Sequence, residues 1–228
     1  MDRLEFYDRQ SAGVLLGIKL AKINLTKPVV LALPRGGIRV AAKVAEALGA
    51  PLDVIVVRKL GVPNRPELAM GALGEDQVVV LNHDVLRRAH VSGDQLHEVE
   101  TRERAELDSR VQRLRAVRPR EPLVGRSAII VDDGIATGAT TRAAIRVARA
   151  HGALDVTVAA PVAPPDVVEM LTDVADRVVC LAEPDPFWAV GSWYRHFEAV
   201  TDDEVISAIS AAYTAGAALA SAQQQPHP

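Results

Sequence analysis

Two adjacent carboxylates, Asp132 and Asp133, follow directly on the apolar run 128–131. A loop rich in glycine and threonine comes next, and an apolar stripe at helical spacing begins at Ala143. A helix N-terminus binds anions because its first backbone N–H groups are unpaired and the helix dipole is positive there. Glycines let the backbone curl close to such an anion, and threonine hydroxyls add hydrogen-bond donors. This succession of strand, acid pair, loop and helix predicts a site for a phosphate beside a polyol.

The acid pair restricts the kind of ligand. Carboxylates beside a phosphate cradle would repel a polyphosphate, so ribose hydroxyls and a Mg²⁺ ion are their natural partners. No Lys-Ser/Thr pair closes the loop, so it is not a nucleotide P-loop, and it lacks the G-x-G-x-x-G pattern of dinucleotide sites. The alternative is an ordinary strand–loop–helix connection in which Asp133 lies near the helix start and Thr137 caps the helix.

Composition bounds the class of protein. The 228 residues are 49% apolar, which suits one large domain or a domain with a small cap. A formal net charge of −3 argues against a general nucleic-acid surface. The single cysteine, Cys180, lies in an apolar run and allows no internal disulfide, as expected in a reducing cytosol. The N-terminal residues hold no apolar signal core, and no run is long enough to span a membrane. We therefore expect a cytoplasmic protein without membrane contact.

Strand and helix patterns alternate along most of the chain. Apolar runs predict strands at 29–33, 52–57, 70–73, 78–81, 128–131, 156–160 and 177–181. Amphipathic patterns predict helices at 8–23, 38–48, after the loop that follows 128–131, at 166–173 and from about 202, whereas the rest of 60–77 is expected to be loop. The alternation predicts an α/β fold with a doubly wound, mainly parallel sheet flanked by helices, and ligands bind such sheets beyond the carboxyl ends of the strands. That edge would gather Arg35, Arg58, Lys59, the acid pair and Glu183.

One segment, about 84–117, interrupts the alternation with a long charged helical pattern. Its apolar stripe predicts an amphipathic helix packed along the edge of the domain. The alternative is a lid over the site or an arm that binds a partner. After about 215 the chain is biased toward Ala, Gln and Pro, which predicts a frayed helix end and disorder over 215–228.

The residues 129–141, IIVDDGIATGATT, resemble the signature of the type I phosphoribosyltransferases. The resemblance implies that Asp132 and Asp133 hold the ribose hydroxyls and metal of 5-phosphoribosyl-1-pyrophosphate (PRPP), with Mg²⁺ as cofactor. It also implies that a loop wraps the 5′-phosphate, formed by Ala136, Thr137, Gly138, Ala139, Thr140 and Thr141. The family's architecture implies one domain over 1–214, with a core at about 28–182 and a small hood from the N-terminal helix and about 183–214.

A second anion loop is expected at residues 33–37, LPRGG. Gly36 and Gly37 allow backbone N–H groups to approach an anion, and Arg35 adds a charge in the same turn. By resemblance this is the pyrophosphate loop, and family members often have a cis peptide at the position of Arg35-Gly36. The basic pair Arg58-Lys59 is expected to bind the same pyrophosphate; the alternative is a solvated pair of charges at a strand end.

The segment 61–74 resembles the mobile loop that closes over the reaction centre in the family, and closure would exclude water that competes for the activated ribose. Hypoxanthine-guanine enzymes carry an Asp where this chain has Ala136, which counts against 6-oxopurine specificity. Adenine enzymes use a Glu of the mobile loop as acid/base, a role that Glu75 or Glu67 could take. The alternative for both is an exposed loop carboxylate.

Five of the eight aromatic residues lie between Phe187 and Phe197. An aromatic cluster near the edge of the sheet suggests a platform on which a planar heterocycle stacks, and resemblance to purine enzymes favours Phe187 and Trp188. The competing interpretation is a small core of the cap, formed by Trp193, Tyr194 and Phe197. His196 is expected at the surface rather than in catalysis.

These features together predict a transferase that moves the 5-phosphoribosyl group from PRPP to a nitrogenous base and releases pyrophosphate. One alternative is a PRPP- or nucleotide-sensing regulator on the same fold, which would need a basic nucleic-acid face or a reader domain. The other is transfer to an acceptor that is not a nucleobase. The partners expected are PRPP, a small-molecule base and a second copy of the chain in a homodimer, without nucleic acid.

Overall fold

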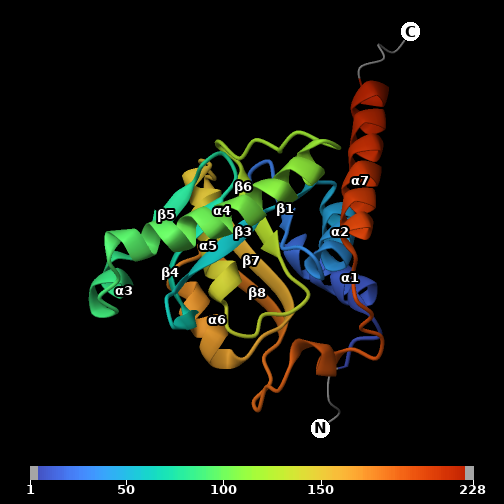
Figure 1. The fold of residues 1–228 in the computed structure, drawn as a ribbon. Coiled ribbons are helices and arrows are strands. Elements are labelled where there is room, and N and C mark those ends of the chain that lie inside the picture. The colour runs from blue at the N-terminus through green and yellow to red at the C-terminus, as the bar shows by residue number, and fades with distance from the viewer. Residues whose placement is uncertain (1–4, 224–228) are drawn as a thin grey trace.

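A five-stranded parallel sheet forms the centre of the molecule, and its order is β2-β1-β6-β7-β8. The computed structural model describes residues 5–223, without the side chains of residue 67 and of residues 215–223. The strands are β1 (Val29–Ala32), β2 (Leu52–Val54), β6 (Ser127–Val131), β7 (Asp155–Val162) and β8 (Arg177–Ala182). Helices cover both faces, so the expected α/β fold with a parallel sheet is confirmed (Figure 1).

The two faces of the sheet are covered by different helices (Figure 1). Successive strand residues point to opposite faces, and in β1 Val30 and Ala32 pack toward α1 (Arg9–Leu20) and α2 (Gly37–Leu48). Val29 and Leu31 pack toward α5 (Ala139–Ala150) and α6 (Pro165–Thr172). Both sets are fully buried, as the continuous apolar run of β1 requires in a parallel sheet covered on both sides.

A second, antiparallel sheet occupies the region that the sequence suggested to be mainly loop. It consists of β3 (Val57–Val62), β4 (Arg65–Gly74) and β5 (Val79–Leu81). A tight turn joins β3 to β4, with Asn64 in the left-handed region at φ 64°. The loop prediction for 61–69 was wrong because prolines and glycines mask the strand pattern, whereas the strands are stabilised by burial of Leu60, Met70 and Leu73.

The charged segment 84–117 forms two helices, α3 (His83–Arg88) and α4 (Gly93–Arg115). A capping box starts α4, in which Ser92 and Gln95 each accept a hydrogen bond from the other's backbone. The buried face of α4, with Val99, Leu107 and Leu114, joins the core beside β3, and its far end approaches α7 (Asp202–Gln223) (Figure 1). The expected amphipathic edge helix is therefore present.

The C-terminal helix α7 continues to Gln223. The helix expected to fray after about 215 thus extends over 215–223, where alanine-rich sequence favours helix, and the disorder expected at this end stays a prediction; residues 224–228 lie outside the described part of the chain. A short helical turn, η1 (Val190–Trp193), precedes α7. Among the described residues, no helix has the length and apolarity that crossing a bilayer demands.

Candidate functional site

The acid pair and the first glycine loop lie in direct contact. Since β1 and β6 are neighbouring parallel strands, with Ala32 opposite Val131, the loops that follow them meet at one edge of the sheet. A Cβ on Gly36 would come 2.0 Å from Oδ2 of Asp133, and one on Gly37 would come 2.7 Å from the carbonyl oxygen of Val131. The loop and the acids can approach this closely only with glycine at both positions.

One detail of this loop differs from expectation. The cis peptide lies between Pro34 and Arg35, not between Arg35 and Gly36. Gly36 already has helical backbone angles, φ −57° and ψ −39°, and leads into α2. The cis bond therefore lies one residue earlier than the family pattern predicted.

Asp133 is held by a residue that the sequence did not single out. The Nε of Arg9 donates to Oδ2 of Asp133 at 2.7 Å, and Nη1 donates to the backbone carbonyl of Glu198 at 2.8 Å. The Arg9 guanidinium also lies 3.6 Å above the ring centroid of Phe197, and the hydroxyl of Tyr194 donates to the carbonyl oxygen of Asp133. The first helix and the segment 194–198 are thus fastened to the acid pair.

Asp132 is the acid of the pair whose pKa is shifted by its surroundings. Burial raises its pKa well above the ordinary value of an aspartate, and the neighbouring Asp133 carboxylate raises it further. The backbone N–H of Asp133 donates to Oδ1 of Asp132 at 2.9 Å, which opposes this shift. A cation bound at this pair in addition to Arg9 would therefore reduce the repulsion between the carboxylates of Asp132 and Asp133.

The start of helix α5 has the form expected of an anion site. Gly138, its N-cap, is left-handed at φ 69°, and no side chain caps the helix. The capping role considered for Thr137 is therefore wrong, and the first N–H groups of the helix are left for another acceptor. Ala136, Thr137 and Thr140 are exposed and Ala139 is half-buried, whereas Thr141 is buried and contributes to packing.

The basic pair Arg58-Lys59 does not end a core strand. The sheet strand β2 stops at Val54, the chain crosses at 55–56, and both residues lie within β3. Arg58 forms ion pairs with Glu103, at 2.9 Å, and with Glu106, both on α4. Arg58 and Arg35 nevertheless line one open cleft of about 560 Å³, and Lys59 is half-buried on the neighbouring strand position.

Glu75 is a structural residue rather than an exposed loop carboxylate. It is 6% exposed, and its two oxygens accept hydrogen bonds from Arg115 at 2.6 and 2.7 Å. Arg115 also donates to the buried Asp53 at 2.8 Å, so the end of α4 is tied to β2 and to the residue that follows β4. This pairing counts against an acid/base role for Glu75, which stays a prediction. Glu67 lies on β4, its side chain is outside the described part of the structure, and its role stays a prediction.

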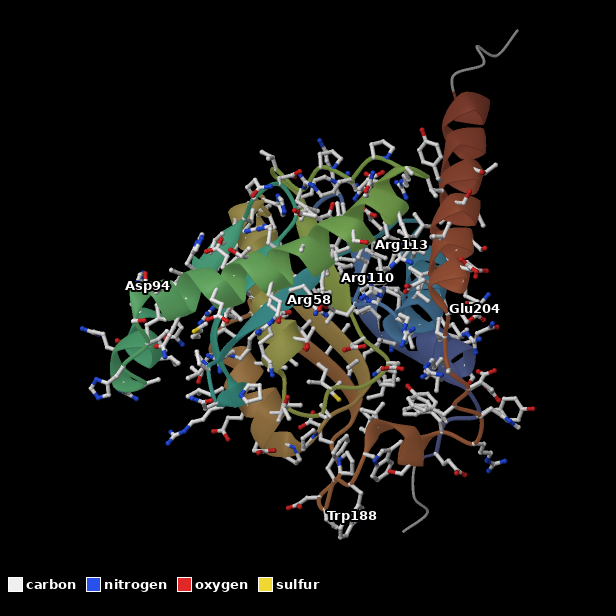
Figure 2. The ribbon with its side chains drawn as sticks, viewed as in Figure 1. Arg58, Asp94, Arg110, Arg113, Trp188 and Glu204 are labelled. Carbon is white, nitrogen blue, oxygen red and sulfur yellow. The ribbon has the colours of Figure 1, made fainter. Side chains whose placement is uncertain are left out.

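The aromatic cluster serves mainly as a cap core. Trp193 and Tyr194 are buried with Phe6, and the half-buried Phe187 packs against the same cluster. Trp188 is 80% exposed at the outer end of its loop, remote in Figure 2 from the labelled arginines of α4. The base-stacking role of Phe187 and Trp188 therefore stays a prediction, and Glu183 is likewise an exposed side chain near this edge. His196 is exposed, as expected.

The fold and this edge of the sheet define a protein of the phosphoribosyltransferase class: a parallel sheet with a second, small antiparallel sheet, two glycine loops and an acid pair between them. Comparison with known proteins agrees. The family model described as "Phosphoribosyl transferase domain" matches residues 6–194, and the chain belongs to this family.

Two relatives show how far the likeness extends. A Mycobacterium tuberculosis protein provisionally named a phosphoribosyl transferase, Rv0571c, is 53% identical over 208 residues, which is 91% of this chain. The chain spans about half the length of that relative (47%). The crystal structure of the protein TT1426 from Thermus thermophilus is 45% identical, with a TM-score of 0.86, over 91% of this chain and 98% of that one.

Proposed function

We propose that the protein transfers the 5-phosphoribosyl group from PRPP to a ring nitrogen of a nitrogenous base and releases pyrophosphate. The observation that supports this most strongly is the contact between the loop at Gly36 and the carboxylate of Asp133. A ribose whose hydroxyls bind the acids would have its C1 atom beside the loop proposed for pyrophosphate. The uncapped start of α5 would receive the 5′-phosphate at the other end of the sugar.

The reaction breaks the bond between C1 and the pyrophosphate oxygen and forms a bond between C1 and the base nitrogen, which then loses its proton. Positive charge develops on the sugar in the transition state. Asp132 and Asp133 face that charge in a partly buried site, where electrostatic stabilisation is strong. Arg35 faces the departing pyrophosphate, and no protein nucleophile takes part. The hydroxyl of Tyr194 stays protonated, because burial raises its pKa and it donates to the backbone of Asp133.

The donor set at the acid pair fits Mg²⁺. No group of three or more His, Cys, Asp or Glu side chains among the described residues could hold a metal by itself. Mg²⁺ binds typically through one or two carboxylates together with substrate phosphates, so Asp132 and Asp133 would suffice with PRPP present. When bound, the ion would neutralise charge on the leaving pyrophosphate.

The acceptor is proposed to be a planar nitrogenous base other than a 6-oxopurine. The chain has Ala136 where 6-oxopurine enzymes place an acid, and this absence of the acid is the ground for the choice. A base bound near Phe187 would be covered by Trp188 only if the loop around residue 188 folded inward. The relatives contain further sequence beyond the region that matches this chain. The activity of a whole protein of that length is therefore proposed here and not established.

The experiment is a measurement of pyrophosphate release from PRPP with Mg²⁺ and a panel of purines, pyrimidines and their analogues. We expect release with at least one base, and loss of at least about 100-fold in rate for Asp132→Asn combined with Asp133→Asn, since both charges that favour the transition state disappear. Asp173→Asn, an exposed aspartate remote from this edge, is the matched control. Pyrophosphate release that persists in the double variant would contradict the assignment of the site. Absence of release with every base in the panel would contradict the choice of acceptor class.

A further inference from the structure

We infer that the cleft between α4 and the loop of Arg35 is a second binding site for a phosphate chain, carried by a small molecule and distinct from the start of α5. Four guanidiniums from three parts of the chain face this cleft of about 560 Å³: Arg35, Arg58, Arg110 and Arg113. Figure 2 shows Arg110 and Arg113 on the part of α4 nearest α7, with Arg58 beside them. Such a volume lies in the range of small-molecule sites, roughly 300–1,000 Å³.

The carboxylates around the cleft do not balance its positive charge. Asp202 is shared, with Oδ1 3.4 Å from Nη2 of Arg110 and Oδ2 3.4 Å from Nη2 of Arg113. Both distances are at the long limit for a hydrogen bond, so one carboxylate spans two guanidiniums without a close bond to either. Arg58 is paired with acids of α4, and among the described residues no hydrogen bond or ion pair reaches the guanidinium of Arg35.

The arginines also repel one another. Burial lowers the pKa of Arg110, the charge of Asp202 opposes this, and the charges of Arg35, Arg113 and Arg58 lower it further. Guanidiniums remain charged in proteins, so the repulsion is present in the folded state. It is relieved when an anion with more charge than one carboxylate enters. Phosphate oxygens accept paired N–H bonds from arginine, which is the geometry that the cluster offers.

Asp202 occupies the position between Arg110 and Arg113 that a phosphate group would take. A phosphate chain would displace it, and the rest of the chain would extend toward Arg58 and Arg35. The site would thus lie next to the proposed pyrophosphate loop and share Arg35 with it. Binding there does not require turnover, so the inference goes beyond the proposed function.

The experiment measures binding of inorganic tripolyphosphate and of ATP by calorimetry, without PRPP, at low and at physiological salt. We expect the affinity to fall at least about tenfold in Arg110→Gln combined with Arg113→Gln, because two charge-assisted contacts are removed. Arg87→Gln combined with Arg102→Gln is the matched control; these side chains are exposed and lie outside the cleft. Equal affinity for the two probes means that the phosphate chain alone is recognised, and tighter binding of ATP means that the nucleoside is also bound; both outcomes support the site.

A gain of affinity provides the second arm. Asp202→Asn removes the competing carboxylate and should bind tripolyphosphate several-fold more tightly than the wild type, whereas Asp94→Asn, at the other end of α4, should not (Figure 2). Absence of binding to the wild type, or equal binding to the wild type and the Arg110/Arg113 variant, would overturn the inference. The panel of bases tests the proposed function separately. If no base gives turnover but the Arg110/Arg113 variant binds tripolyphosphate more weakly than the wild type, only the proposed function fails. If a base gives turnover but the two proteins bind tripolyphosphate equally, only the second site fails.

Discussion

The Nε of Arg9 lies 2.7 Å from Oδ2 of Asp133, and both side chains are almost enclosed, with exposed fractions of 6% and 13%. The pair joins the first helix of the chain to the acid motif at the end of β6. It leaves one oxygen of Asp133 for other partners, and it keeps a positive charge beside two carboxylates that otherwise repel each other.

Replacing Arg9 by Met should therefore destabilise the protein strongly. Removal of one partner from a buried ion pair leaves an uncompensated charge and costs about 3–5 kcal/mol in the free energy of unfolding. Urea denaturation measures this cost. Arg39→Met is the control, because Arg39 pairs with Glu204 in a more exposed setting, and it should cost about 1 kcal/mol or less. If both variants lose the same small amount, Arg9 does not anchor the acid pair.

Gly36→Ala tests the contact between the glycine loop and the acid pair. The backbone angles at Gly36 suit alanine, but the new Cβ would lie 2.0 Å from Oδ2 of Asp133. Since Arg9 holds that carboxylate, either the loop or Asp133 must shift, and a displacement of about 1 Å at a reacting centre costs on the order of 100-fold in rate. The measurement is the initial rate of pyrophosphate release with the base identified from the panel.

The control for this substitution is Gly93→Ala. Gly93 begins α4, and a Cβ there meets no atom within 4 Å. We expect full activity and a gain in stability of up to about 1 kcal/mol, because alanine restricts the unfolded chain more than glycine does. A fully active Gly36→Ala variant would show that the loop and the acids move independently.

Glu75→Gln separates a structural role of Glu75 from a catalytic one. The carboxylate accepts two hydrogen bonds from Arg115, and loss of its charge should lower the free energy of unfolding by about 1–3 kcal/mol. The turnover number of the folded variant should stay at the wild-type value. Glu46→Gln, an exposed partner of Lys43, should change neither quantity. Reduced turnover at unchanged stability would restore Glu75 as a catalytic residue.

The sequence patterns predicted those elements whose structure is determined by residues adjacent in the chain. The strand, loop and helix at 128–150 are encoded by adjacent residues, so the acid pair and the uncapped helix start could be located from the sequence. The hairpin at 57–74 could not, because its strands are stabilised by contacts with α4 and α5 rather than by a clear alternation of their own.

Long-range pairs were beyond the reach of such patterns. Arg9 and Asp133 are 124 residues apart, and nothing around Arg9 distinguishes it from other charged residues at the start of an amphipathic helix. The same holds for Arg110 and Arg113, which face Asp202 only because α4 crosses the sheet toward α7. Whether a charged side chain is buried depends on how elements distant in the sequence pack together. It therefore cannot be read from the sequence of one element.

Ionisation of Asp132 in the acid pair should lower the free energy of unfolding. In the folded protein the pKa of Asp132 is raised by burial and by Asp133, above the value of about 3.9 expected in the unfolded chain. The stability that this group contributes is therefore present below the unfolded pKa and is lost as pH rises through the folded pKa, so at neutral pH its ionisation destabilises the fold. Asp132→Asn removes that ionisation, and its Oδ1 can still accept the hydrogen bond from the N–H of Asp133.

Without Mg²⁺ or PRPP, Asp132→Asn should thus be more stable than the wild type at pH 8, by about 1 kcal/mol or a rise in Tm of about 2–4 °C. With Mg²⁺, PRPP and a base present, the same variant should lose turnover. The difference in Tm should shrink toward pH 4, where Asp132 in the wild type is also neutral. Thermal unfolding of both proteins across this pH range measures it. A variant that is less stable than the wild type at pH 8, or a difference that grows toward acid, would mean that Asp132 is stabilised as an anion in the folded state.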